Sequence, residues 1–351
     1  MNHRAVLYAL AAAALFGVST PLAKALTGSI DPFVLAGLLY IGAGLGVAGI
    51  RGLAANAAAS GHEREASLSR ADMPWLAGAI LAGGVAGPLL LMVGLTHTDA
   101  ASASLLLTFE GVATALIAWF VFHENFDRRI ALGMALLVAG ALVLSWSGSP
   151  TLSGITGPVA VIAACIAWGV DNNLTRKVSL SDPLQIVQFK GLVAGPINLA
   201  LGLFTGGILP AMPVASAALL VGFLGYGVSL VCFVLALRHL GSARTGAYFS
   251  TAPFLGTLVA IIGFNEPLTW QIALAGILMA AGVWLHLTEH HEHDHGHEAM
   301  EHSHSHVHDD HHQHKHADDD PSGEPHTHLH RHAPLTHRHA HAPDMHHGHR
   351  H

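Results

Sequence analysis

Ten long apolar runs between residues 5 and 287 limit what this chain can fold into. A run of about 18 or more apolar residues is long enough to cross the hydrocarbon core of a bilayer as a helix. Only 11% of the residues are charged, whereas soluble domains contain about 25%. Because lipid offers no hydrogen bonds to an exposed backbone, we predict an all-α membrane protein. The predicted spans are residues 5–26, 33–53, 74–95, 102–122, 130–147, 157–175, 184–205, 215–237, 245–264 and 269–287.

The lysines and arginines between these runs predict the orientation of the chain. Loops that carry an excess of Lys and Arg stay on the cytoplasmic side. Alternate loops contain Arg51, Arg64, Arg70, Arg128, Arg129, Arg176, Lys177, Arg238 and Arg244. The opposite loops hold almost none, with Lys24 at a helix end as the exception. We therefore predict a multi-pass protein of a bacterial-type inner membrane with both termini in the cytoplasm.

The two halves of the apolar region resemble each other. Leu95-Thr96-His97 matches Leu237-Arg238-His239, and Phe122-His123-Glu124 matches Phe264-Asn265-Glu266. Each half has five predicted spans, an odd number, so the second half enters the membrane upside down. Inverted repeats of this kind are typical of secondary transporters, which bind substrate near the midplane between the halves. We predict three parts: a first five-helix repeat over residues 1–147, a second over 148–288, and a tail over 289–351.

Several motifs resemble those of EamA-type transporters in the drug/metabolite transporter superfamily. The residues that carry the resemblance are Phe16-Gly17-Val18-Ser19 with Lys24, Glu110-Gly111, Pro253, Glu124, Glu266 and Lys190. The chain departs from the family pattern at His123 and Asn265, which replace Gly, and at Leu39, which stands where Lys190 stands in the second half. The resemblance covers about residues 5–287. It implies a substrate-transporting protein that needs no cofactor.

A few polar residues inside the spans are the candidates for substrate binding or coupling. Ionisable groups in a membrane are costly and usually face a cavity or a partner. The candidates are Glu110, Lys190, Asp171, Asn172, Ser19, Thr20 and Lys24. Glu110, near the middle of its span, suits proton exchange, and the alternative is a buried neutral packing acid. Lys190 and Asp171 either take part in transport or form a structural ion pair.

Other residues in the spans have two possible interpretations, one functional and one structural. Aromatic side chains at Trp168, Tyr226, Tyr248, Phe249 and Phe254 line a cavity in one interpretation and only pack in the other. Glu124 and Glu266, at the ends of spans, are expected to cap or orient the turn into the next helix.

The segment 289–351 differs in kind from the rest of the chain. It contains 24 of the 30 histidines, mostly in His-x-His spacing, and few large apolar residues. Such a composition predicts a disordered tail. Neutral imidazole is a good ligand for Zn, Ni, Co and Cu. The candidate ligands are His293, His295, His297, His302, His304, His306, His308, His326, His328, His330, His332, His337, His339 and His341. The alternative is a segment that responds only to pH, because imidazoles protonate near pH 6.5.

The sequence favours a secondary transporter, in the exporting direction, of small metabolites such as amino acids or drug-like compounds. The alternative is a transporter or sensor of Ni, Co or Zn that uses the tail as an ion antenna. The expected partners are a small-molecule substrate, the lipid bilayer and divalent metal ions, with a homodimer left open. No enzyme motif occurs, and no basic face is available to bind nucleic acid.

Overall fold

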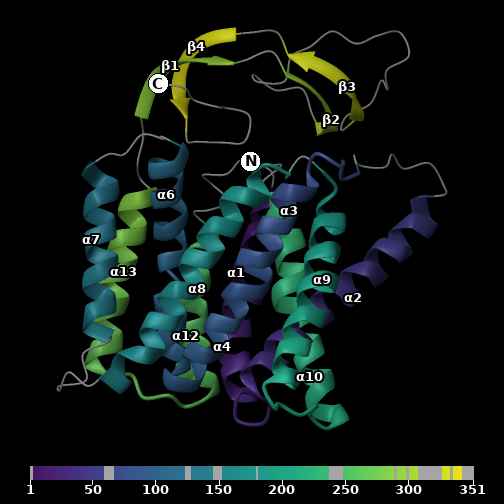
Figure 1. Ribbon diagram of the computed structural model, residues 1–351. Coiled ribbons are helices and arrows are strands. Elements are labelled where there is room, and N and C mark those ends of the chain that lie inside the picture. The colour runs from purple at the N-terminus through teal and green to yellow at the C-terminus, as the bar shows by residue number, and fades with distance from the viewer. Residues whose placement is uncertain are drawn as a thin grey trace.

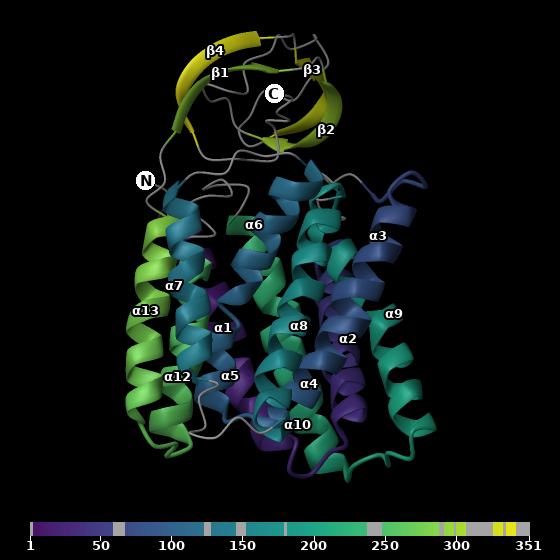
Figure 2. The ribbon, with the colours of Figure 1, turned by 60° about the vertical axis from the view of Figure 1, so that its left-hand side comes forward.

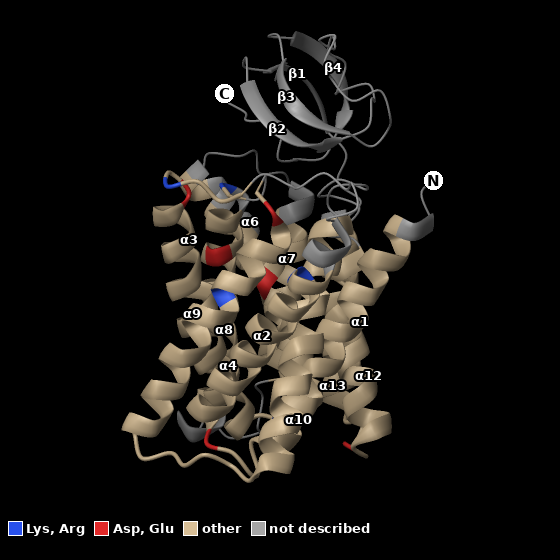
Figure 3. Ribbon diagram, turned by 90° about the vertical axis from the view of Figure 1, so that its right-hand side faces the viewer, with Lys and Arg blue, Asp and Glu red and all other residues tan. Residues whose placement is uncertain are grey.

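The computed structural model describes residues 3–58, 67–122, 128–144, 152–178, 181–236, 248–287, 291–297, 300–306, 326–332 and 335–341. Up to residue 287 the regular elements of this described chain are all helices, and they stand side by side in one bundle (Figure 1). Figure 3 shows that the helices carry few charged residues along their length. Both findings support the predicted all-α, multi-pass membrane architecture.

The elements of the two halves follow the same order. The first half contains α1 (His3–Leu26), α2 (Pro32–Ala58), α3 (Met73–Ala79), the π-helix η1 (Ile80–Ala86), α4 (Gly87–His97), α5 (Ala100–Leu106), α6 (Phe109–Phe122) and α7 (Arg128–Leu144). The second half contains α8 (Leu152–Arg176), α9 (Pro183–Phe204), α10 (Met212–Gly222), the π-helix η2 (Phe223–Val228), α12 (Ala252–Gly263) and α13 (Trp270–Leu287).

Matching Asp-Pro pairs begin the second helix of each half. Pro32 is the first residue of α2 and Pro183 is the first residue of α9. Proline suits this position because its fixed φ is helical and it has no N–H to leave unpaired. The preceding aspartates cap the exposed amides: Asp31 Oδ1 accepts from Phe33 N at 3.0 Å, and Asp182 Oδ1 accepts from Leu184 N at 2.9 Å. The repeated motif therefore has a local physical cause.

Six helical segments of the described chain are long and apolar enough to cross a membrane. They are Ala5–Leu26, Pro32–Leu53, Met73–His97, Ile155–Thr175, Pro183–Phe204 and Met212–Ala236. Four more apolar helices are shorter: Ala100–Thr114, Ala131–Leu144, Ala252–Gly263 and Trp270–Leu285. The predicted span 102–122 is not one continuous helix, because a turn at Leu107 and Thr108 separates α5 from α6. The Thr108 hydroxyl donates to the Leu105 carbonyl in this turn, which favours a break in the helix.

Equivalent helices of the two halves pack against each other. The largest helix–helix interface joins α2 to α9, and α7 pairs with α13 (Figure 2). At the α2–α9 crossing, a Cβ atom on Gly191 would overlap the backbone of Gly44. Small residues at such a crossing let two helices approach closely, which is how helices commonly associate in lipid. The two halves are therefore joined by their matching faces.

Each half also contains a π-helical segment at the same place. In the alignment that pairs Leu95 with Leu237, η2 (Phe223–Val228) falls against residues 81–86, which are nearly the whole of η1. π-helical turns are rare, and they occur frequently at functional sites. Each π-helix interrupts the helix that comes after the second helix of its half, α2 or α9. The two halves therefore share an irregular feature as well as their regular helices.

In the segment 289–351, for which the sequence predicts a disordered tail, the described residues are four strands. Strands β1 (His291–His297) and β4 (Leu335–His341) form one antiparallel pair, and β2 (Met300–His306) and β3 (His326–His332) form another. The His-x-His spacing has a period of two, which is also the period of a β-strand, so the pattern suits an extended backbone. The two strands of each pair bond to each other across the ladder, and this pairing does not need an apolar core.

Candidate functional site

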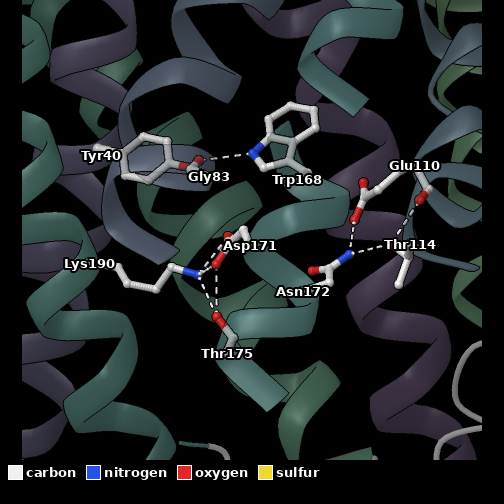
Figure 4. A network of polar contacts seen from close by, with 9 residues as sticks. All are labelled: Tyr40, Gly83, Glu110, Thr114, Trp168, Asp171, Asn172, Thr175 and Lys190. Atoms are coloured by element: carbon white, nitrogen blue, oxygen red, sulfur yellow. Dashed lines mark hydrogen bonds and ion pairs between the residues drawn. The ribbon is translucent and has the colours of Figure 1, made fainter. Parts of the chain in front are cut away.

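A buried ion pair lies between α8 and α9. Lys190 Nζ lies 2.6 Å from Oδ1 and 2.7 Å from Oδ2 of Asp171, and it donates to Thr175 Oγ1 at 3.2 Å (Figure 4). Thr175 in turn donates to Asp171 Oδ1 at 2.8 Å. Lys190 and Asp171 are each 6% exposed. Two buried charges in this geometry neutralise each other, so the cluster has no net charge.

Beside the ion pair, Glu110 of α6 is bound to the next residue of α8. Asn172 Nδ2 donates to Glu110 Oε1 at 2.9 Å and to Thr114 Oγ1 at 3.2 Å. Thr114 Oγ1 donates to the Glu110 carbonyl at 2.8 Å. Glu110 is partly exposed and Asn172 is exposed, in contrast to the buried ion pair. Glu110 is therefore less enclosed as a residue than the two members of the ion pair.

Side chains of three helices hold the carbonyl groups of η1. The Gly83 carbonyl accepts from Tyr40 Oη at 2.7 Å and from Trp168 Nε1 at 2.9 Å (Figure 4). The Gly84 carbonyl accepts from Asn198 Nδ2 at 2.8 Å. A Cβ atom on Gly83 would also overlap the Asp171 carboxylate, so glycine is needed for this close approach. Thus η1 is fixed to α2, α8 and α9.

An aromatic cluster adjoins the same network and contains residues of both halves. The ring of Phe16 has its centroid 6.3 Å from that of Trp168, 6.0 Å from that of Tyr226 and 5.5 Å from that of Phe249. Tyr40 and Tyr226 lie 5.6 Å apart. Trp168 and Asn172 are four residues apart on α8 and so share a face of that helix. The cluster and the Glu110 network are therefore neighbours.

Three buried hydroxyl groups, those of Thr98, Ser104 and Tyr226, have no hydrogen bond of normal geometry among the described residues. Tyr226 is 9% exposed and Ser104 is 1% exposed. Most buried polar atoms in proteins are paired, so an unpaired one calls for an explanation such as a ligand or a water. The Tyr226 hydroxyl belongs to the aromatic cluster described above.

The three remaining predicted residues are all on α1, and Ser19 adjoins the aromatic cluster beside Tyr226. Ser19 and Thr20 are buried on α1, and the Ser19 hydroxyl donates to the Phe16 carbonyl at 2.6 Å. Lys24 donates from Nζ to the Leu95 carbonyl near the end of α4. A cation at a helix C-terminus stabilises the free carbonyls there. Lys24 therefore binds the backbone of α4, far along α1 from Phe16.

The predicted tail ligands are placed only as backbone. All lie in β1–β4 except His308, which is outside the described residues. Among the side chains that the structure does describe, no group of three or more His, Cys, Asp or Glu residues is arranged to hold a metal ion.

Glu266 links the two halves at the opposite end of the bundle. Its carboxylate accepts from Ala100 N at 2.9 Å and from Ala101 N at 2.8 Å, at the start of α5. The expectation that Glu266 caps a helix is correct, although the helix belongs to the other half. A cavity of about 260 Å³ adjoins it and is lined in part by Asp99, Ser102 and Gln271. Glu124 lies outside the described residues.

Sequence reasoning missed several members of the network. Tyr40, Thr114, Thr175 and Asn198 were not predicted, although each bonds to the centre. Asn198 carries a detectable signal, since an amide inside an apolar span needs a buried partner. The threonines give no such signal, because Ser and Thr can bond to their own helix.

Taken together, the apolar helical bundle and its buried polar centre define a membrane transporter, without enzymatic motifs. The EamA-like transporter family matches the chain twice, over residues 3–146 and 155–288. The chain therefore belongs to the EamA-like transporter family, within the drug/metabolite transporters.

Individual relatives agree with this assignment. An "Uncharacterized transporter" of Methanothermobacter thermautotrophicus is 31% identical, over 79% of this chain and 84% of its own length. A "Probable terminal-alkyne amino-acid exporter" of Streptantibioticus cattleyicolor is 28% identical over 61% of this chain and 73% of its own. A "Probable amino-acid metabolite efflux pump" of Salmonella typhimurium is 23% identical over 53% and 66%. One solved structure, at 18% identity, matches the fold with a TM-score of 0.59 over 80% of this chain and 95% of its own.

Proposed function

We propose that this protein is a secondary transporter that exports small metabolites, such as amino acids or drug-like compounds, through ten spans in two inverted five-helix repeats. The observation that carries the proposal is the polar network at the centre, to which α6 of the first half and α8 and α9 of the second contribute. Polar groups buried where the halves of an inverted repeat meet are the usual place for substrate. Two relatives, named as a probable amino-acid exporter and a probable amino-acid metabolite efflux pump, support this class.

Both termini are cytoplasmic in this proposal. The Lys and Arg bias supports it, and α1 begins and α13 ends toward the same end of the bundle in Figure 1. The test uses Ser303→Cys in a chain whose native Cys165 and Cys232 are replaced. An impermeant thiol reagent should not label it in intact cells, while Ser29→Cys in the α1–α2 turn should be labelled. Labelling of Ser303→Cys from outside contradicts the orientation.

Glu110 couples transport to protons in this proposal. It is an acid inside a predicted span, and the charged groups close to it are Asp171 and Lys190, which pair with each other. Glu110→Gln keeps the shape of the side chain and removes its titration. We expect reconstituted Glu110→Gln protein to lose most transport and its dependence on pH, with unchanged amounts of folded protein. Equal activity at every pH would make Glu110 a packing residue.

The tail binds divalent metal in this proposal and regulates or buffers rather than transports it. Its strand register supports the idea, because histidine stands opposite histidine in six cross-strand positions: His291–His341, His293–His339, His295–His337, His302–His330, His304–His328 and His306–His326. Imidazole pairs are suitable donors for Zn, Ni, Co or Cu.

The test of the transport class is flux in vesicles. Reconstituted protein is given amino acids, nucleosides and Zn, Ni or Co, with and without the tail. We expect saturable movement of a metabolite in both forms, with metals changing only the rate of the tailed form. Saturable movement of a metal by the form without the tail would instead support the alternative, a metal transporter.

A further inference from the structure

The charges at the centre restrict what the site can take. Lys190 is fully used by Asp171 and Thr175, so it offers no free cation to an anionic substrate. Among the described residues, the Glu110 carboxylate accepts one side-chain hydrogen bond, from the Asn172 amide, and Glu110 is partly exposed. A carboxylate with one neutral donor still has unused acceptor capacity. An ionised Glu110 therefore gives this part of the described site an unbalanced negative charge.

The groups around Glu110 suit an ammonium group and an apolar body. The Tyr226 hydroxyl is within electrostatic range of Glu110 and lies beside Ser19, without a hydrogen bond of normal geometry among the described residues. Tyr226 packs on Phe16, and Phe16 packs on Trp168. Aromatic ring faces attract cations within about 6 Å of the ring centroid. A carboxylate beside aromatic rings is thus complementary to a protonated amine at one end and to an apolar body at the other.

We propose that the central site takes a substrate that carries a protonated amine on an apolar or aromatic body. Glu110 receives the ammonium group, the Tyr226 hydroxyl provides a second polar contact, and the rings of Phe16 and Trp168 contact the body. The proposal rests on the transport function above and narrows its substrate class. It disfavours substrates with only an anionic group, because they would meet Glu110 without a free cation to balance them.

A bare divalent metal ion suits this site less well than an amine. Metal sites need several carboxylate, imidazole or thiolate ligands, and no group of three such side chains occurs among the described residues. The donors next to Glu110 are an amide, a threonine hydroxyl and aromatic rings. Their chemistry favours a large, weakly hydrated organic cation.

Three probes of one shape test the proposal on the purified full-length protein. Phenethylamine, phenethyl alcohol and phenylacetate share the ring and chain and differ in charge at neutral pH. Binding is measured by calorimetry and by the shift in melting temperature. We expect the amine to bind roughly 10- to 100-fold more tightly than the alcohol, the range that one charge-assisted contact provides. The acid should bind more weakly than the alcohol.

Variants then assign the preference to Glu110. Glu110→Gln should bind the amine and the alcohol about equally, and Glu110→Asp should restore part of the amine preference, because the charge returns. Asp72→Asn is the matched control, since it also removes one carboxylate but lies in an exposed turn, where Asp72 bonds to Ser69. Its amine preference should equal that of the unaltered protein.

Three results would overturn the proposal: equal binding of amine and alcohol by the unaltered protein, tighter binding of the acid, or no binding of the amine. An amine preference that survives in Glu110→Gln would overturn the role of Glu110. The comparison in the unaltered protein needs no variant to fold. Failure of the transport function is recognised separately, because the vesicle assay would then show no flux of any compound while these binding results still stand.

Discussion

At the scale of single residues, Lys190 and Asp171 are the most informative pair. Each is costly to bury alone, and the structure offsets both costs by placing them 2.6 Å apart with Thr175 beside them. The same contact that stabilises Lys190 also removes it from substrate recognition. Glu110 differs because its partner Asn172 is neutral. Because Lys190 pairs with Asp171 and not with Glu110, Glu110 is the acid that remains available to a substrate.

We predict that the ion pair is structural. Asp171→Asn leaves Lys190 buried without a counter-charge, and removal of one partner of a buried pair costs about 3–5 kcal/mol. The double variant Asp171→Leu with Lys190→Met removes both charges and should recover most of that loss. Thermal unfolding of the purified proteins measures the difference. If Asp171→Asn abolishes transport but melts like the unaltered protein, the pair instead takes part in coupling.

At the scale of elements, the two π-helices are equivalent in position but not in their surroundings. The η1 carbonyls accept from Tyr40, Trp168 and Asn198. The motif Phe16-Gly17-Val18 on α1 resembles Trp168-Gly169-Val170 on α8, so the first-half counterpart of Trp168 is Phe16, whose ring has no hydrogen-bond donor. The two π-helices thus have equivalent positions but different hydrogen-bond partners. The side-chain donors to η1 lie beside the Glu110 network.

The α2–α9 crossing gives a prediction at the same scale. Gly191→Ala places a Cβ atom against the backbone of Gly44, and overpacking of this kind costs about 1–3 kcal/mol. We expect a lower melting temperature and weaker association of the two halves when they are expressed as separate chains. The matched control is Gly49→Ala on α2, where a Cβ atom meets nothing within 4 Å. That control should melt no lower than the unaltered protein, because alanine favours the helix.

At the scale of the whole molecule, the tail is separate from the bundle in its composition and in its pairing. The strands pair only with one another, β1 with β4 and β2 with β3, in the described chain. The two segments that match the transporter family are residues 3–146 and 155–288, and the second ends where the tail begins. Folding and transport should therefore not depend on the tail.

Truncation after Thr288 tests this separation. We expect the shortened protein to insert, fold and transport, and to lose most of its metal binding, because 24 of the 30 histidines are removed. In the full-length protein, metal binding should weaken as the pH falls below about 6.5, where imidazoles protonate and stop acting as ligands. Titration calorimetry with Ni or Zn measures both effects. Equal stoichiometry in the two forms would locate the metal site in the membrane part and favour metal transport.

The sequence by itself determined the class of the protein. Long apolar runs require helices in lipid, and the matched Asp31-Pro32 and Asp182-Pro183 begin equivalent helices for local reasons. It also identified Glu110, Asp171, Asn172 and Lys190, because ionisable and amide groups are conspicuous in an apolar span. These signals are local, so they can be read before the chain folds.

Only the tertiary structure decided how those groups are used. Lys190 pairs with Asp171 rather than Glu110, Glu266 caps a helix of the other half, and Tyr40 and Asn198 bind η1. Each of these contacts joins residues on different helices, and the spacing along one helix carries no information about its neighbours' faces. The π-helices and the break between α5 and α6 also depend on contacts between helices, so the sequence pattern did not predict them. Packing selects which backbone groups depart from the regular helical hydrogen bonds.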